Sequence, residues 1–162
     1  MKPKAYVETS VISYYTARPS HDLIVAAHQE ITHDWWDNQR SNYDLYTSQV
    51  VHDEAGTGDP EAAAKRIQAL QGIEFLDVSD EAAELAEKLL AEKCLPKKAA
   101  EDALHIAIAA IHRMNYLITW NCKHLANALM RSAIENVIRQ NGYQPPIICT
   151  PEELLGEKDH VD

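Results

Sequence analysis

Short apolar segments alternate with longer segments of helical periodicity along this chain, and this alternation constrains the fold more than any other feature. Strands are predicted at 4–8, 43–48, 73–78, 116–120 and 147–149. Helices are predicted near 11–17, 21–40, 49–55, 60–71, 80–93, 97–114 and 124–141, with a short last helix from 150. The alternation predicts a three-layer α/β/α fold with a mostly parallel sheet of about four to five strands.

Local signals predict where individual helices begin. Thr9 and Ser10 suit the cap of a helix that begins near Val11. Asp59 suits a cap as well, because Pro60 follows it and fits the first helical position.

The length of 162 residues favours one domain. We expect a single domain over 1–156 and a disordered tail over 157–162. Residues 19–41 form a helical insertion that either covers the site as a lid or builds a protein interface. Within it, Trp35 fits the apolar stripe of a core-facing helix, whereas Trp36 is expected to be partly exposed or to lie in a dimer contact.

Charge limits the classes of partner. The chain has 15 Lys and Arg against 25 Asp and Glu, a formal net charge of −10. Binding of duplex nucleic acid through a broad basic face is therefore not expected. Nucleic acid itself is not excluded, because divalent cations can bridge carboxylates to phosphates.

Other features bear on location. No run approaches 18 apolar residues, so no membrane span is expected, and the N-terminus lacks the apolar core of a signal peptide. The three cysteines, Cys94, Cys122 and Cys149, form neither a disulfide framework nor a paired metal motif. These observations favour a reducing, cytoplasmic location.

Oxygen-bearing side chains occur where parallel strands end. Glu8 ends the first predicted strand and Asn121 follows the strand 116–120, while Glu54 and Asp102 lie on helices next to strands. Ligands of open parallel sheets bind beyond the carboxyl ends of the strands. If the strands are neighbours, three carboxylates and an amide oxygen converge, which suits Mg²⁺ and metal-assisted hydrolysis of phosphodiesters.

Each residue also has an interpretation without chemistry. Glu8 can be a solvated strand end, Glu54 an exposed helix residue, and Asn121 a turn residue. A negative charge such as that of Asp102 near the start of a helix interacts favourably with the helix dipole, and this benefit requires no catalytic role. Asp53 and Asp59 are near enough to compete for the role of Glu54, and Glu101 would interact with the helix dipole as favourably as Asp102.

Two further features have a structural and a functional interpretation. His105 lies three residues after Asp102 and shares its helix face, but a hydrogen-bonded structural histidine is the favoured interpretation. Several lysines form either a basic rim around the acidic centre or, by default, an ordinary solvated surface: Lys93, Lys97, Lys98 and Lys123. Lys123, close to Asn121, is a candidate phosphate contact.

Three segments together resemble the PIN domain, the nuclease fold of many toxin–antitoxin ribonucleases. Tyr-Val-Glu-Thr-Ser-Val-Ile-Ser at 6–13 resembles the opening strand with the first acid. Glu-Asp-Ala-Leu-His-Ile-Ala at 101–107 resembles the segment of the third acid, and Leu-Ile-Thr-Trp-Asn-Cys-Lys-His-Leu at 117–125 the strand and turn of the fourth polar ligand. The resemblance spans roughly residues 4–150.

The resemblance implies a set of site residues. Glu8, Glu54 and Asp102 take the places of the three acids, and Asn121 takes the fourth position. In the family these positions bind Mg²⁺ or Mn²⁺, and the metal activates water to cut single-stranded RNA. Hydroxyl positions of the family correspond to two residues that would contact substrate: Ser10 and Thr119.

This sequence departs from the family pattern at two of these positions. The first acid is usually Asp, and the additional methylene of Glu8 moves its carboxylate outward by roughly 1.5 Å. The fourth position is often Asp, and Asn121 brings one negative charge less to the site.

The resemblance further implies the toxin of a toxin–antitoxin pair, a homodimer that an antitoxin protein holds inactive. Two alternatives remain open. One is a catalytically weak or inactive PIN-fold binding module, which the Glu8 and Asn121 departures motivate. The other is a Mg²⁺-dependent phosphohydrolase of small phosphate esters, against which count the missing Asp-x-Asp pair and Gly-rich phosphate loop.

Overall fold

Five parallel strands form one sheet in the computed structural model, which describes residues 1–123, 125 and 127–156. The predicted tail at 157–162 lies outside the described residues. The strands are β1 (Lys4–Val7), β2 (Asp44–Ser48), β3 (Glu74–Leu76), β4 (Tyr116–Ile118) and β5 (Ile147–Cys149). Their order is β3-β2-β1-β4-β5, and every neighbouring pair is parallel.

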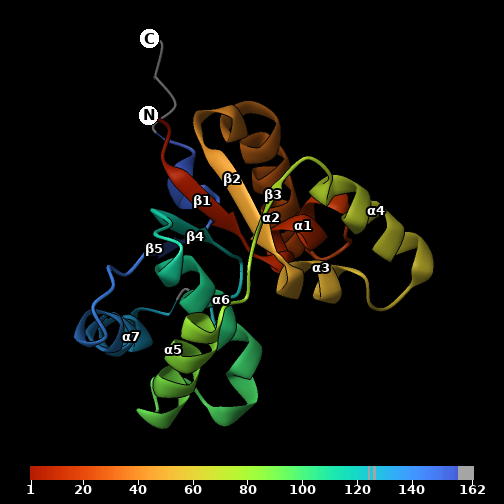
Figure 1. Cartoon of the computed structure of the whole chain (residues 1–162). Helices are drawn as coiled ribbons and strands as arrows, with labels where there is room; N and C mark the ends of the chain where they lie inside the picture. The colour runs from red at the N-terminus through yellow and green to blue at the C-terminus, as the bar shows by residue number, and fades with distance from the viewer. Residues whose placement is uncertain (124, 126, 157–162) are drawn as a thin grey trace.

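Helices cover both faces of this sheet (Figure 1). They are α1 (Thr9–Thr16), α2 (Leu23–Asp34), α3 (Gln49–Ala55), α4 (Pro60–Leu70), α5 (Asp80–Ala91), α6 (Ala100–Ile111) and α7 (Ala128–Gln140). Parallel crossovers are right-handed, so connections that run toward β3 and those that run toward β5 lie on opposite faces. Accordingly α1 packs with α2, α3 and α4, whereas α5 packs with α6 and α7. The predicted three-layer α/β/α architecture is confirmed.

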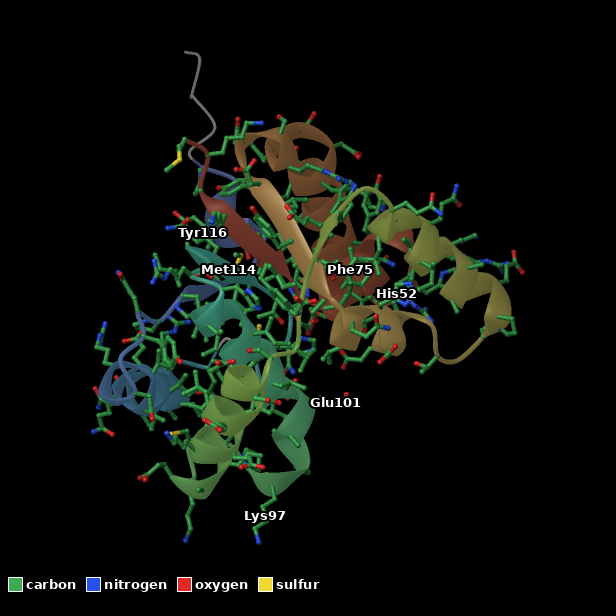
Figure 2. All side chains as sticks on the ribbon, in the orientation of Figure 1. His52, Phe75, Lys97, Glu101, Met114 and Tyr116 are labelled. Atoms are coloured by element: carbon green, nitrogen blue, oxygen red, sulfur yellow. The ribbon has the colours of Figure 1, made fainter. Side chains whose placement is uncertain are left out.

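The core lies on both sides of the central strands. Three residues of β1, Ala5, Tyr6 and Val7, have no exposed surface, and Leu117 and Ile118 of β4 are equally buried. Both faces of these strands are covered by helices, which explains why they are continuously apolar rather than alternating. The outer strands are less covered: in β3, Phe75 is 45% exposed and contacts His52 of α3 (Figure 2).

The start of α1 differs from the sequence-based prediction. The helix begins at Thr9, and its N-cap is Glu8, whose carboxylate accepts a hydrogen bond from the Ser10 backbone N–H. Glu8 has the extended backbone of a cap residue (φ −81°, ψ 157°), so β1 ends at Val7. A carboxylate is favourable here because the first N–H groups of a helix carry partial positive charge.

The predicted helix over 21–40 is interrupted. After α2 the chain forms a π-helical turn, Trp35–Gln39, and then a 3₁₀ turn, Arg40–Asn42. Trp35 has no exposed surface and Trp36 is only 7% exposed, so the expectation of a partly exposed Trp36 was wrong. The wider π turn gives two adjacent bulky rings access to the interior, which the 100° step of a regular α-helix disfavours.

Several other helices are shorter than predicted. Lys93 and Arg113 adopt left-handed backbone conformations (φ 58° and 60°) just after α5 and α6, which end these helices. Residues 97–99 form a 3₁₀ turn before α6. Helix α7 begins at Ala128, capped by Asn127, rather than at 124. Of its predicted first residues, 124 and 126 lie outside the described part of the chain.

The last predicted helix is a single 3₁₀ turn, Glu152–Leu154. In the part of the chain that the structure describes, no helix has both the length and the apolar character needed to span a bilayer.

Two leucines provide a test of the core. Leu117→Ala in β4 removes a side chain with no exposed surface, so we expect the free energy of unfolding to fall by about 2–5 kcal/mol. Leu129→Ala in α7 changes a side chain that is 93% exposed and should shift it by no more than about 0.5 kcal/mol. Chemical denaturation measures both, and equal losses would contradict this placement of β4.

Candidate functional site

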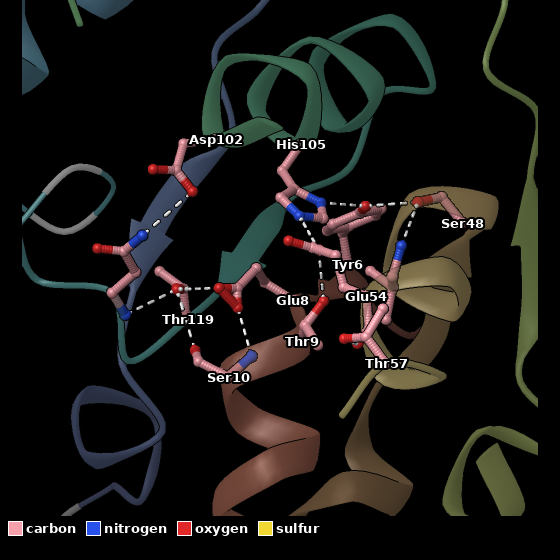
Figure 3. Close-up of polar contacts among 12 residues, drawn as sticks. Tyr6, Glu8, Thr9, Ser10, Ser48, Glu54, Thr57, Asp102, His105 and Thr119 are labelled. Carbon is pink, nitrogen blue, oxygen red and sulfur yellow. Dashed lines mark hydrogen bonds and ion pairs between the residues drawn. The ribbon is translucent and has the colours of Figure 1, made fainter. Parts of the chain in front are cut away.

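The order of the strands identifies one position on the sheet for a site. From β1 the chain continues to β2 and β3 on one side, whereas β4 and β5 lie on the other side of β1. In open parallel sheets, ligands bind at such a switch point, beyond the carboxyl ends of the strands. Glu8 follows β1 and Thr119–Asn121 follow β4, so both segments lie at this point (Figure 3).

Glu8 is the buried acid of the site. Its side chain accepts hydrogen bonds from the Ser10 backbone N–H and from the Thr119 hydroxyl, the latter at 3.2 Å. Only 5% of its surface is exposed. Burial raises the pKa of Glu8 above its ordinary value, although the His105 charge and the hydrogen bonds from Ser10 oppose this. A cation bound here would relieve the cost of the buried charge.

Two hydroxyl groups connect the ends of β1 and β4. Thr119 Oγ1 accepts a hydrogen bond from the Asn121 backbone N–H at 2.9 Å, and Ser10 Oγ accepts one from the Trp120 N–H at 2.8 Å. The two hydroxyl oxygens are 3.4 Å apart. Both hydroxyl residues predicted to bind substrate therefore form hydrogen bonds within the protein, and Thr119 is fully buried. Their contact with RNA stays a prediction.

Asp102 and Asn121 come together from α6 and from the loop after β4. The Asn121 side-chain amide donates to Asp102 Oδ1 at 3.1 Å. Since Nδ2 of Asn121 is the donor, its Oδ1 is the atom with the character of a cation ligand. Two residues that are 19 positions apart thus form one pair at the sheet edge.

Glu54 reaches the same edge from α3 and is held by a second group of contacts. Its Oε1 accepts hydrogen bonds from the Thr9 hydroxyl at 2.7 Å and from His105 Nε2 at 2.6 Å. His105 Nδ1 is 2.7 Å from the Tyr6 hydroxyl, which in turn is 2.7 Å from Ser48 Oγ. Figure 3 shows this chain of polar contacts running from Glu54 through His105 and Tyr6 to Ser48.

The electrostatics of Glu54 and His105 reinforce each other. Burial alone would lower the pKa of His105, but the hydrogen bond and charge of Glu54, with the charges of Glu8 and Asp102, raise it above its ordinary value. Burial would conversely raise the pKa of Glu54. The hydrogen bond and charge of His105 lower it instead, and interactions with Thr9 and Glu101 act in the same direction. His105 is therefore within electrostatic reach of all three acids.

A fourth carboxyl lies beside the site, and the sequence-based prediction gave it no role there. The side chains of Glu101 of α6 and Glu54 lie close together, and the interaction with Glu54 and its charge raise the pKa of Glu101. Together they line a shallow pocket between α3 and α6. The i, i+4 spacing of Glu101 and His105 was the available signal, since these positions share a helix face.

The structure thus brings the predicted residues to one edge, but in two groups. The first group consists of Glu8, Ser10 and Thr119 with the nearby Asp102–Asn121 pair. The second consists of Glu54 and the hydrogen-bond chain through His105 (Figure 3). Among residues 1–123, 125 and 127–156, no three His, Cys, Asp or Glu side chains are arranged to hold a metal ion.

The chemistry of the donor set nevertheless fits a hard divalent cation. The acids offer carboxylate oxygens and Asn121 an amide oxygen, the ligands that Mg²⁺ takes in proteins. Among the described residues no Lys or Arg forms an ion pair with Glu8 or Glu54, and His105 is the nitrogen base that contacts Glu54.

Of the lysines considered for a basic rim, Lys123 is exposed in the loop after Asn121. Its backbone carbonyl accepts a hydrogen bond from the Asn127 side chain. Lys97 lies at the outer end of the α5–α6 pair, farther from α3 than Glu101 (Figure 2). Lys123 remains the predicted phosphate contact.

Comparison with known proteins identifies the family. The PIN domain model matches residues 5–121, which include all four predicted ligand positions. No curated protein sequence matches the chain.

Solved structures share the fold. A chain of VapBC2 from Rickettsia felis, bound to a DNA fragment from their promoter, is 15% identical with a TM-score of 0.56, over 90% of this chain and 97% of that one. VapC20 from Mycobacterium tuberculosis, a Sarcin-Ricin loop cleaving toxin, is 17% identical with a TM-score of 0.59, over 76% of this chain and 94% of that one. The family model covers most of the sequence and the fold agrees with it: the chain belongs to the PIN domain family.

Proposed function

We propose that this protein is a divalent-metal-dependent endoribonuclease that hydrolyses phosphodiesters of single-stranded RNA, with Mg²⁺ or Mn²⁺ as cofactor. The observation that carries the proposal is the gathering of Glu8, Glu54, Asp102 and Asn121 at the switch point of a PIN-domain sheet. Glu8, Glu54 and Asp102 are the proposed catalytic acids, and all four residues are the proposed ligands.

Each residue has a distinct part in this proposal. A bound divalent cation would polarise the phosphodiester and lower the pKa of a water molecule. Glu8, held by Thr119 and Ser10, supplies a buried carboxylate at the centre of the site, while Asn121 orients Asp102. Lys123, exposed in the loop after Asn121, is the proposed contact to a phosphate of the RNA.

The biological setting is also proposed. The likeness in fold to VapBC2 and VapC20 supports a toxin of a toxin–antitoxin pair, acting in the cytoplasm as a homodimer and inhibited by an antitoxin protein. We propose one domain over 1–156, in which the 19–41 segment packs its helix α2 against α1.

A catalytically weak PIN-fold binding module is the second candidate. It is favoured by the finding that, within the described residues, no three His, Cys, Asp or Glu side chains of this sheet edge are arranged to hold one metal ion. It is also favoured by Glu8, whose carboxylate already accepts two protein hydrogen bonds. This candidate predicts RNA or partner binding without turnover.

Asp102 and metal removal give the first test of the nuclease. We expect a fluorescently labelled single-stranded RNA to be cleaved with Mn²⁺ or Mg²⁺ and to remain intact with EDTA. Asp102→Asn replaces a negatively charged ligand by a neutral one and should lower kcat/KM by about 100-fold or more. Loss of a residue that only hydrogen-bonds to a metal ligand typically costs about 10- to 100-fold, and loss of a ligand's charge should cost at least as much. Equal cleavage by wild type, variant and EDTA-treated protein would refute the metal assignment.

Two adjacent acids on α3 give a matched comparison. Glu54→Gln removes a charge at the site and should lower cleavage at least about tenfold. Asp53→Asn removes the same charge one position earlier, where the exposed carboxylate accepts a hydrogen bond only from Gln49 among the described residues. We expect this control to cleave RNA at the wild-type rate, and the reverse ranking would show that Asp53 is the second acid.

Thermal stability distinguishes the two candidate functions. Mn²⁺ at 100 times its Kd stabilises a protein by about 2.7 kcal/mol. For a chain of this size, that corresponds to a Tm increase of roughly 5–10 °C. We expect such a rise for the wild type by differential scanning fluorimetry and a much smaller one for Asp102→Asn. RNA binding with neither a Mn²⁺-dependent Tm shift nor cleavage would favour the binding module.

A further inference from the structure

The buried hydrogen-bond chain beside Glu54 has no part in the metal site as proposed so far. It runs from Ser48 at the end of β2 to Tyr6 in β1, His105 in α6 and Glu54 in α3. The successive contacts are 2.7, 2.7 and 2.6 Å long. Thr9 at the start of α1 binds the same Glu54 oxygen at 2.7 Å.

The contact between His105 and Glu54 has a defined donor. A carboxylate only accepts hydrogen bonds, so His105 Nε2 carries a proton and donates it to Glu54 Oε1. On the other side of the ring, His105 Nδ1 shares a hydrogen bond with the Tyr6 hydroxyl at 2.7 Å. Burial keeps the Tyr6 hydroxyl protonated by raising its pKa. Both ring nitrogens of His105 are therefore hydrogen-bonded, and the contact with Tyr6 fixes the orientation of the ring from the side opposite Glu54.

Packing alone does not explain a histidine at this position. His105 is 1% exposed and lies among buried apolar residues of α6 such as Ala103 and Ile106, where an apolar side chain would avoid the cost of burying a polar ring. Glu54, whose side chain is 27% exposed, is accessible to water and does not need a buried partner for solvation. What the short bond adds is a restriction of the carboxylate to one position.

We infer that His105 is a positioning residue for Glu54: held by Tyr6, it fixes the carboxylate of the second acid in the orientation in which that acid contributes to divalent-metal binding. This inference rests on the proposed function, since it assigns a partner to one of the proposed ligands. Hydrogen-bond partners of metal-binding carboxylates typically contribute 10- to 100-fold to metal affinity or activity.

Two substitutions of His105 separate positioning from packing. His105→Gln places an amide N–H close to the position of Nε2 and can still donate to Glu54, whereas His105→Asn is too short to reach it. We expect the Mn²⁺ Kd, measured by calorimetry without RNA, to rise about 10- to 100-fold in His105→Asn and by less than about threefold in His105→Gln. His112→Asn is the matched control, at the end of the same helix, where the ring bonds the Asp77 carbonyl.

A milder variant covers the case in which a His105 substitution impairs folding. Tyr6→Phe removes one oxygen, keeps the ring and leaves His105 Nδ1 without the hydroxyl that orients it. We expect the Mn²⁺ Kd to rise several-fold. The far-UV circular dichroism spectrum should stay like that of the wild type, which would show that the variant is folded. RNA cleavage at saturating Mn²⁺ should recover more completely than cleavage at limiting Mn²⁺ in all positioning variants.

The outcomes distinguish this inference from the proposed function. If the wild type binds Mn²⁺ and cleaves RNA while His105→Asn and Tyr6→Phe bind Mn²⁺ as tightly as the His112→Asn control, the positioning role is wrong and the nuclease stands. Equal losses in His105→Gln and His105→Asn would likewise overturn it, because packing and not the donated hydrogen bond would be responsible. A wild type that neither binds Mn²⁺ nor cleaves RNA would overturn both.

Discussion

β1 pairs in parallel with β4 although their contacting residues are 111 positions apart in the chain. This pairing places the last strand-forming residues of two distant segments at one edge of the sheet. The backbone N–H of Glu8 donates to the Ile118 carbonyl at 3.0 Å, so the first acid is attached directly to the end of β4. The candidate site depends on this register, because a displaced strand would separate Glu8 from Thr119 and Asn121.

The same convergence brings several negative charges close together, and neighbouring hydrogen-bond donors partly compensate them. The Ser10 N–H in the first turn of α1 donates to Glu8, and the imidazole of His105 contacts Glu54 and lies within electrostatic reach of Glu8 and Asp102. Like charges held close together in a partly buried site raise one another's pKa values unless a positive group compensates them. The proposed divalent cation would act on a site that is already partly compensated, which gives the surrounding hydrogen bonds a direct influence on metal affinity.

The sequence was most informative where its signals are local. Alternating segments predicted the α/β/α layers, and Asp59 before Pro60 correctly predicted the cap of α4. Prediction failed where packing overrides local preference. Thr9 was expected to cap a helix that in fact begins with it, because the carboxylate of Glu8 accepts a hydrogen bond from the Ser10 N–H in the first turn. Trp36 was expected to be partly exposed, but a π turn that no spacing rule indicates turns it inward.

Taken alone, the sequence determined the fold class and the family and supplied four residues for a proposed site, because helical and strand periodicity and short motifs are properties of neighbouring residues. Only the tertiary structure decided how these residues are grouped. The partnership of Glu54 with His105, the orientation of that ring by Tyr6, and the pairing of Asp102 with Asn121 join segments that are far apart in the chain. Contacts between such separate segments form only when the strand order of the sheet is established. No local sequence pattern specifies that order.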